Sequence, residues 1–519
     1  MKFLTIGTEV LLALLSAVLL IFSFPEFDLG FLAWVALVPL LVTLKNKSLK
    51  SAFGLSLLTG VSFFMGICYW MKFVRGFSWF EFFLWGLYLG SYIGLFGLAL
   101  NFITGGARLS RIVVAPALWV STEYLRSHMG FLGIPWGLLG HSQYLNLPII
   151  QISSLTGVYG ISFLIVMVNA TLSESILAWI AAKQGTLVQH RRKLLVPAVV
   201  TTALVGVSLA YGFFTISNEP WGDKIRMSVV QANIPRDMTW KREFQRTNLN
   251  KHIRLTQEAT KIGDPSLIVW PGSSVEGYFT SELYLLDTLS THAKEISTHL
   301  LIGSSQRPKF GSREFRRKNW LNSAFLLSPN GAIVGQYNKI HLFPFGEYLP
   351  YDWLWPLMFA SAPRDGHAIP GNEYNVFSVN GAKFGVAICW ESIFPDLVRG
   401  FVKNGANFMV NITNEVLFGE TAAPYQFLAM NVFRAVENRI SIARSANTGI
   451  SGFIDPYGRI MGKVKNGDKD IFVDGYLTMD IPLSQQRTFY TEYGDIFTYI
   501  NLLLTFFMLA VSVLKIRTG

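Results

Sequence analysis

The sequence contains few cysteines and few charged residues. Only two of its 519 residues are cysteine, Cys68 and Cys389, which argues against a disulfide framework, and we interpret both as unpaired. Charged residues make up 15% of the chain and hydrophobic residues 51%, so it is too apolar for an ordinary soluble enzyme and too long for one domain. The histidines show no metal-ligand spacing, and there is no CxxC motif and no glycine-rich phosphate loop.

Long apolar runs fill the first 215 residues. A membrane-spanning helix needs about 20 apolar residues, and seven runs in this part approach that length, with an eighth near the C-terminus. The first run lacks a small-residue cleavage site, so we interpret it as an uncleaved span rather than a signal peptide. The predicted spans are about 8–24, 29–44, 53–74, 80–104, 112–128, 155–180, 194–215 and 496–514.

The basic residues between the spans predict how the chain is oriented. One set of links contains Lys2, Lys45, Lys47, Lys50, Arg108, Arg111, Lys183, Arg191, Arg192, Lys193, Lys515 and Arg517. The opposite set contains only Lys72, Arg75 and Arg126. This excess places both termini in the cytoplasm and the large region before the last span on the outer face. Much of the net charge of +11 is then a topology signal rather than a nucleic-acid-binding patch.

The region 216–490 has a different pattern, in which short β-rich runs alternate with amphipathic helices. This alternation predicts an α/β domain with covered sheets. We therefore expect a membrane domain of seven helices over 1–215, an α/β domain over 216–490, and a last span with a short tail over 491–519. The predicted strands are 225–231, 266–270, 300–303, 323–327, 333–337, 384–389, 408–412, 440–445 and 452–455, and the predicted helices are 247–261, 283–295 and 425–438.

Cys389 and Lys339 are the candidates for covalent chemistry. Cys389 ends a buried-strand pattern, and active sites of α/β folds gather at such strand ends. A thiolate nucleophile needs a nearby cation to lower its pKa, and Lys339 can supply that charge and stabilise an oxyanion. The alternatives are a packed core thiol for Cys389 and a solvated charge for Lys339.

No carboxylate occupies the position where we expect a general base. Acyl transfer through a thiol requires a group that takes up protons, and a carboxylate with a raised pKa suits this task. A third predicted strand leads into Trp270-Pro271-Gly272, which ends on a glycine. Glu276 is the nearest acid in the sequence, and Glu347 and Glu391 are candidates from other segments. Glu391 can also be read as a helix N-terminal acid.

Taken together, these segments resemble the bacterial apolipoprotein N-acyltransferases over essentially the whole chain. Those are inner-membrane proteins with eight spans and a periplasmic nitrilase-like domain. In the first half the matching residues are Ala115–Trp119, Glu123, Arg126, Ile134–Trp136, Gly140, Ser142 and Gln143. In the second half they are Val230–Pro235, Trp240, Tyr337–Lys339, Phe345–Glu347, Cys389–Glu391, Asn414, Phe418 and Gly419.

The resemblance implies a four-layer α-β-β-α sandwich with a Glu-Lys-Cys triad. Cys389 would be the nucleophile that carries an acyl thioester, and Lys339 would stabilise the tetrahedral intermediates. Glu347 and Glu391 would be supporting acids. Trp240 would be an important loop residue, and Trp390 replaces the tyrosine often found after the cysteine.

The implied reaction is ping-pong and needs no metal or dissociable cofactor. A phospholipid would donate an acyl chain to the cysteine, and the free α-amine of a diacylglyceryl-cysteine apolipoprotein would accept it. The implied location is the bacterial inner membrane, with the catalytic domain on the periplasmic face and no nucleic-acid partner.

Gly272 departs from this pattern, because it stands at the glutamate of the family's Trp-Pro-Glu-Ser motif. Three explanations remain open: a variant or engineered form of an active enzyme, a natural paralogue that has lost catalysis, or a substitute acid such as Glu276. Two other functions remain open on the same scaffold. One is a non-catalytic lipid- or lipoprotein-binding protein, and the other is a membrane-tethered amidase of the nitrilase type.

Overall fold

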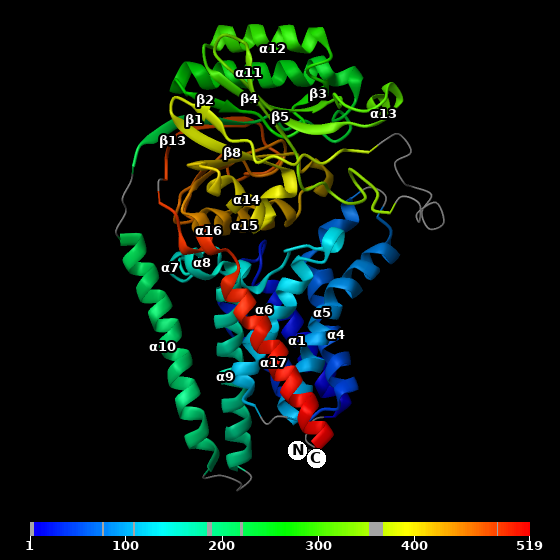
Figure 1. Ribbon diagram of the computed structural model, residues 1–519, viewed down its shortest axis with the longest axis vertical. Helices are drawn as coiled ribbons and strands as arrows, with labels where there is room; N and C mark the ends of the chain where they lie inside the picture. Colours follow the sequence, from blue (N-terminus) through cyan, green and yellow to red (C-terminus); the bar gives the residue numbers. More distant parts are fainter. Residues whose placement is uncertain are drawn as a thin grey trace. The chain divides into compact units, whose positions relative to one another are not determined.

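The computed structural model describes residues 5–74, 77–106, 109–183, 189–217, 222–351, 367–484 and 486–518 (Figure 1). The chain divides into two compact units. The helical unit consists of Met1–Glu219 together with Tyr493–Gly519, and the sheet unit consists of Pro220–Glu492.

The helical unit contains a helix in each of the eight predicted apolar runs. They are α1 (Ile6–Phe22), the broken segment η1 (Gly30–Leu32), α2 (Ala33–Ala36) and α3 (Val38–Thr43), then α4 (Leu49–Ile67), α5 (Trp79–Gly106), α6 (Arg111–Ser127), α9 (Val158–Lys183), α10 (Gln189–Ser217) and α17 (Ile496–Thr518). Among the described residues, five helices are long and apolar enough to cross a membrane, namely Leu49–Ile67, Trp79–Gly105, Val158–Lys183, Leu195–Ser217 and Ile496–Lys515. The remaining runs form shorter or less apolar helices.

The second predicted span is interrupted at Leu37, between α2 and α3, and Pro39 lies in the first turn of α3. Proline has no N–H to donate, so it cannot continue the hydrogen-bond ladder of α2 into α3. The Asn169 side chain compensates, because its Oδ1 accepts from the Leu37 N–H at 2.8 Å. A side chain of α9 thus satisfies the backbone at the break.

Two buried charges of α6 hold the loop that follows this helix. Glu123 Oε1 accepts from the Leu139 backbone N–H at 2.7 Å. Arg126 donates to the carbonyl oxygens of Ile134, at 3.1 Å, and Trp136. Charges inside an apolar helical unit are costly unless they are paired or hydrogen-bonded, and these two have backbone partners.

The sheet unit is built on two sheets. The first has the strand order β13-β1-β2-β4-β5-β6, with β3 paired to β4, and the second has the order β12-β11-β10-β9-β8-β7. The first sheet contains β1 (Lys224–Gln231), β2 (Leu267–Val269), β3 (Val275–Tyr278), β4 (His299–Gln306), β5 (Leu321–Leu327), β6 (Ile333–Asn338) and β13 (Gly475–Pro482). The second contains β7 (Phe377–Val379), β8 (Ala382–Ile388), β9 (Phe408–Thr413), β10 (Ser441–Ala446), β11 (Gly452–Ile454) and β12 (Ile460–Lys463).

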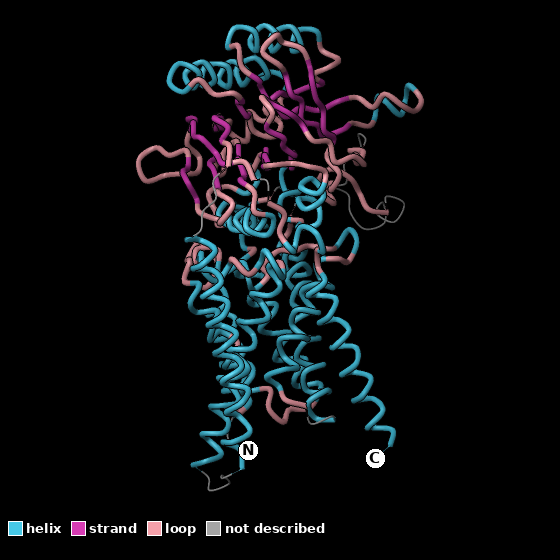
Figure 2. The backbone as a smooth tube through the Cα atoms, turned by 60° about the vertical axis from the view of Figure 1, so that its left-hand side comes forward, coloured by secondary structure: helices cyan, strands magenta, loops and turns pink. Residues whose placement is uncertain are grey.

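Helices cover the outer face of each sheet, as the layering within this unit shows (Figures 1 and 2). α11 (Gln245–Gly263) and α12 (Leu283–Ile296) lie on the first sheet, and α14 (Pro395–Lys403) and α15 (Ala423–Asn438) lie on the second. Between the sheets, the Ser445 hydroxyl bonds the Val230 and Val269 carbonyl oxygens at 2.8 and 3.1 Å. The predicted four-layer α-β-β-α sandwich is confirmed.

Several elements of the sheet unit were not predicted. They are β3, β7, β12, β13, α13 (Arg313–Lys318), α14 and α16 (Phe489–Tyr493). Most are too short to show a period, and β13 pairs with β1 across more than 240 residues of sequence, so no local pattern reveals its partner.

The carboxyl ends of the strands carry the residues that the sequence singled out. β8, β9 and β10 are mutually parallel, so their carboxyl ends meet at one edge, where ligands of α/β folds bind. Gly272, Lys339, Cys389 and Asn414 come directly or closely after β2, β6, β8 and β9, and Asn447, which the sequence did not single out, follows β10.

Candidate active site

Cys389 lies on a sharp turn directly after β8. Its φ is +57°, a left-handed conformation that non-glycine residues seldom adopt and that is concentrated at functional sites. The turn is held by the Asn411 side chain, whose Nδ2 donates to the Ala387 and Cys389 carbonyl oxygens at 3.0 and 3.1 Å. Because Ile388 pairs with Ile412 in the parallel ladder, Cys389 lies across from Thr413. The residue as a whole is partly exposed.

The thiol of Cys389 is in a mixed electrostatic environment. Burial raises its pKa, whereas the charge of Lys339 and a hydrogen bond from the Thr413 side chain lower it. The charges of Glu347 and Glu415 raise it again, and the balance leaves the pKa above its ordinary value. The resting group is therefore a protonated thiol at neutral pH, and a base must take its proton before it can attack.

Lys339 is fully buried and is not a solvated charge. It is 1% exposed, and its Nζ donates to Glu347 Oε1 and Oε2 at 2.9 and 2.8 Å. Burial lowers the pKa of Lys339, but the charges of Glu347, Cys389 and Glu391 outweigh that effect, and the pKa is raised overall. Lys339 therefore stays cationic beside the thiol, as a group that stabilises an oxyanion requires.

Glu347 is bound by donors on both of its oxygens. Besides Lys339, it accepts from the Asn322 Nδ2 at 2.8 Å and from the Phe343 N–H at 2.7 Å. A carboxylate held by a cation and two further donors is suited to fixing the lysine rather than to receiving protons.

Glu391 joins the cysteine turn to the lysine segment. It is completely buried and accepts from the backbone N–H groups of Ile340, His341 and Ile388 at 2.7, 2.9 and 2.8 Å. The Tyr337 hydroxyl donates to it at 2.9 Å. Burial raises the pKa of Glu391 to about 7, although the Lys339 charge and the donated bonds lower it. Glu391 thus serves as a structural link between the two functional segments.

Trp390 and Trp240, the two tryptophans of the predicted site, lie in different environments. Trp390 is buried, and its Nε1 donates to the His341 carbonyl oxygen at 2.6 Å, so it also ties the cysteine turn to the lysine segment. Trp240 is 49% exposed with a φ of +62°, and its backbone N–H donates to Glu276 Oε1 at 2.9 Å. Trp240 therefore belongs to the surroundings of Glu276.

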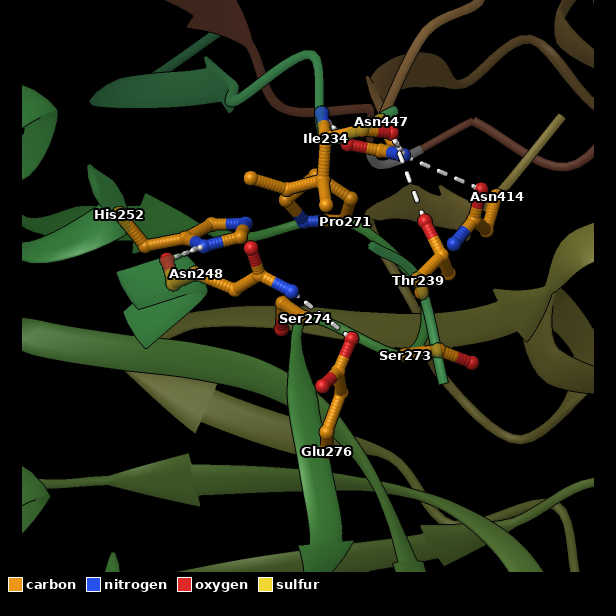
Figure 3. A pocket seen from close by; sticks show the side chains of 11 residues that line it. Ile234, Thr239, Asn248, His252, Pro271, Ser273, Ser274, Glu276, Asn414 and Asn447 are labelled. Atoms are coloured by element: carbon orange, nitrogen blue, oxygen red, sulfur yellow. Dashed lines mark hydrogen bonds between the residues drawn. The ribbon is translucent and has the colours of Figure 1, made fainter. Parts of the chain in front are cut away.

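Gly272 lines a small pocket at the carboxyl end of β2 (Figure 3). A β-carbon placed on Gly272 would lie 3.1 Å from the Ile412 oxygen and from the Thr413 Cα, so a side chain fits if these neighbours move by a few tenths of an ångström. The adjacent strand needs its own glycine, because a β-carbon on Gly303 would lie 2.8 Å from the Ser273 nitrogen. The structure brings Glu276, the nearest acid in the sequence, to the same pocket.

The sequence analysis missed a second buried carboxylate near the thiol. Glu415 is fully buried and forms an ion pair with Arg444. Thr413 Oγ1 lies 3.4 Å from Glu415 Oε1 and is also the hydrogen-bond partner of Cys389, so its single hydroxyl hydrogen serves one of these two acceptors at a time. Burial raises the pKa of Glu415, and the Arg444 charge lowers it. The signal was available, because Asn414 and Glu415 follow a buried strand just as Cys389 does.

Asn248 and His252 were also missed. Both lie on α11 and line the pocket at Gly272. The helix itself was predicted, but its sequence gives no sign that these two polar residues face a strand end rather than solvent.

Comparison with known proteins places these observations in one family. Residues 16–171 match the family model described as the apolipoprotein N-acyltransferase N-terminal domain, and residues 226–489 match the model described as carbon-nitrogen hydrolase. A relative from Geobacter metallireducens named apolipoprotein N-acyltransferase is 36% identical over 500 residues, covering 95% of this chain and 92% of the relative. One from Treponema denticola, named apolipoprotein N-acyltransferase 1, is 30% identical over 538 residues, covering 96% and 94%.

Solved structures similar to part of this chain include an amidase and a member of the nitrilase superfamily. An amidase from Nesterenkonia sp. is 18% identical, with a TM-score of 0.37 and coverage of 54% of this chain and 97% of that chain. Nit3 from Saccharomyces cerevisiae, a member of branch 10 of the nitrilase superfamily, is 18% identical, with a TM-score of 0.38 and coverage of 51% and 92%.

The match over 226–489 makes the sheet unit a carbon–nitrogen hydrolase domain, here joined to a unit of apolar helices. The chain belongs to the apolipoprotein N-acyltransferase family. The resemblance inferred from the sequence motifs is confirmed.

Proposed function

We propose that this chain transfers an acyl group from a phospholipid, through a thioester on Cys389, to the N-terminal amine of a diacylglyceryl-cysteine apolipoprotein. The observation that carries the proposal is the partly exposed Cys389 on a strained turn, with the buried cation of Lys339 acting on its sulfur. The names of the relatives support the same reaction class.

In the first half-reaction the sulfur attacks the ester carbonyl of the phospholipid. The thiol proton is released, the carbon–sulfur bond forms, and the carbon–oxygen bond to the glycerol breaks, so that a lysophospholipid leaves with a proton on its oxygen. The oxyanion of the tetrahedral intermediate is stabilised by Lys339, which Glu347 fixes in place.

In the second half-reaction the amine of the acceptor attacks the thioester. The carbon–nitrogen bond forms, the carbon–sulfur bond breaks, and the amine loses a proton while the cysteine regains one. Lys339 supports the departing thiolate, because its charge lowers the pKa of Cys389.

We propose that Gly272 slows the chemistry at the deprotonation of Cys389. The pKa of that thiol is raised, and a general base typically contributes about 10²–10⁴-fold to a rate. The chain is then an acyltransferase of reduced turnover rather than one without a nucleophile.

Gly272 also motivates a second candidate function, a non-catalytic lipid- or lipoprotein-binding protein on this scaffold. The two functions differ in what they require of the sulfur. If binding is the role, Cys389→Ala leaves complementation of an acyltransferase-depleted bacterium unchanged, whereas the catalytic role is lost in that variant.

The location we propose is the bacterial inner membrane, with the sheet unit on the periplasmic side. The five long apolar helices and the distribution of lysine and arginine support this topology. Labelling of single cysteines placed at Lys261 and at Lys50 with a membrane-impermeant maleimide tests it, because only the first should react in intact spheroplasts.

The reaction itself is tested by incubating the purified chain with phospholipid and a synthetic diacylated lipopeptide. We expect an N-acylated lipopeptide and a lysophospholipid in equal amounts, and neither product with Cys389→Ala. Failure of the Gly272→Glu variant to form either product would remove the proposed function.

A further inference from the structure

Three buried polar atoms without a hydrogen-bond partner line one pocket. They are Asn248 Oδ1, His252 Nε2 and Glu276 Oε2, and none of them has a partner among the described residues. Asn248 and His252 are each 2% exposed. Figure 3 shows the three side chains one after another along one side of the pocket, with Thr239, Asn414 and Asn447 on the other side. An unpaired buried polar group costs free energy, so a cluster of three favours a species in the pocket that donates hydrogen bonds.

The free nitrogen of His252 is a hydrogen-bond acceptor. The other ring nitrogen, Nδ1, lies 2.8 Å from the Asn248 carbonyl oxygen. A carbonyl oxygen can only accept, so Nδ1 carries the hydrogen. Burial lowers the pKa of His252 to about 4, and the neutral ring therefore has a bare lone pair on Nε2.

The free atoms of Asn248 and Glu276 are acceptors as well. The Asn248 amide is fixed in orientation, because its Nδ2 donates to the Met238 carbonyl oxygen at 3.2 Å and to Glu276 Oε1 at 3.0 Å. Its Oδ1 is therefore the unpaired end. Glu276 Oε1 accepts from Asn248 and from the Trp240 N–H, which leaves Oε2 for a ligand.

Three acceptors, one of them on a carboxyl group, define the chemistry of the ligand. It must donate several hydrogen bonds, and a positive charge favours it. A primary ammonium group has three N–H donors and one positive charge, whereas an anion would face only lone pairs.

The pocket lies next to the cysteine turn. Gly272 lines it and packs against Thr413, and Asn414 lines it from the next position of the chain. Thr413 follows Ile412, which pairs with Ile388, the residue before Cys389, and the paired strands β8 and β9 are spaced about 4.8 Å apart. Glu276, Ser273 and Asn414, which line the pocket, are partly exposed as residues.

We propose that Asn248, His252 and Glu276 form a site for a primary ammonium group, and that this site receives the α-amine of the acyl acceptor. The assignment of the acceptor amine as occupant rests on the proposed function, whereas the ammonium site itself does not. In the aminolysis step one ammonium proton passes to Glu276 Oε2, and the free amine attacks the thioester. The carbon–sulfur bond breaks, and the second amine proton passes to the thiolate of Cys389.

Direct binding tests the ammonium site without any turnover. The full-length chain in detergent, labelled with ¹⁵N in its histidines, is titrated with methylammonium chloride and, in parallel, with tetramethylammonium chloride. We expect a saturable shift of the His252 Nε2 signal with methylammonium only. The signal is assigned by its loss in His252→Phe.

The matched control is His292→Phe. His292 is equally buried and faces the same Trp270 ring, with centroids 6.2 Å apart against 4.9 Å for His252, but it does not line the pocket. This variant should keep the shift. No shift, the same shift with both salts, or a shift obtained with Zn²⁺ but not with methylammonium would overturn the ammonium site.

Kinetics test whether the acceptor amine is the occupant. Cys389 is loaded from a p-nitrophenyl acyl ester, and decay of the adduct is followed against the concentration of a diacylated lipopeptide. We expect Glu276→Gln and His252→Phe to raise the half-saturating lipopeptide concentration at least tenfold.

A different source of the ammonium group gives a different pattern. If the donor head group occupies the site, Glu276→Gln slows loading from phosphatidylethanolamine but not from phosphatidylglycerol, and the lipopeptide dependence stays the same. That result overturns the assignment to the acceptor. If no variant is ever loaded, the proposed function fails, whereas the titration still decides whether the ammonium site exists.

Discussion

Gly272 lies directly against Thr413, the residue that hydrogen-bonds the Cys389 thiol. A β-carbon on Gly272 would be 3.1 Å from the Thr413 Cα. Gly272, where a catalytic carboxylate is expected, is therefore separated in space from Cys389 by Thr413. A side chain fits at Gly272 if the backbone of Ile412 and Thr413 moves by a few tenths of an ångström. Apart from the carboxylate missing at Gly272, the contacts of Cys389, Lys339 and Glu347 are in place.

Restoring a carboxylate at this position should increase turnover. We expect Gly272→Glu to raise the rate of Cys389 acylation by about 10²–10⁴-fold, because a base then takes the thiol proton. The measurement is the rate of acyl-enzyme formation from phospholipid. Gly272→Gln is the control, since it fills the same space without a basic group and should stay at the level of the unchanged chain. Equal rates for the two variants would contradict the assignment.

Removing the cation beside the thiol should raise the pKa of Cys389. The Lys339 charge lowers that pKa, so Lys339→Met should move the pH dependence of Cys389 alkylation by iodoacetamide to higher pH. A Cys68→Ala background removes the other thiol. Glu420→Gln is a suitable control, because this glutamate is exposed and pairs with Lys469. An unchanged profile in Lys339→Met would show that the lysine does not act on the sulfur.

Thr413, like Lys339, should lower the pKa of the Cys389 thiol. Its side-chain hydrogen bond lowers the pKa of Cys389, so Thr413→Val should also move the alkylation profile to higher pH. Thr413→Ser keeps the hydroxyl and should restore the original profile. If valine and serine give the same curve, the hydroxyl is not a partner of the sulfur.

Glu391 predicts a pH dependence of stability. Its pKa is about 7 in the folded chain and about 4.3 when unfolded, so between these values the folded state binds more protons. Stability contributed by this group is therefore lost as the pH rises from about 4.3 to 7. Glu391→Gln cannot titrate at this position. The thermal midpoint of the original chain, measured relative to that of this variant, should therefore fall as the pH rises over that range. If the midpoint of the original chain instead rises relative to that of the variant, Glu391 is held as a carboxylate at low pH.

The sequence was sufficient to predict the strands that present the site, and β8 and β9 in particular are short, largely apolar runs followed by candidate site residues. Cys389 and Lys339 could be singled out at the ends of predicted strands. Glu347 and Glu391 could be named but not distinguished, since only their partners show that one holds Lys339 and the other links two backbone segments.

The pocket could not be predicted from local patterns. It combines Gly272 and Glu276 from the end of β2 and from β3 with Asn248 and His252 from α11, and no sequence period brings these together. The second predicted span illustrates another limit, because at its break the Leu37 N–H is bound by an amide from α9.

The most direct test of the central claim is the intact mass of the purified chain after incubation with phospholipid. We expect one added fatty acyl group, mapped to Cys389, that appears slowly in the unchanged chain and faster in Gly272→Glu. We also expect no added mass in Cys389→Ala. The claim is contradicted if Gly272→Glu gains no acyl group, or if the group is found on a residue other than Cys389.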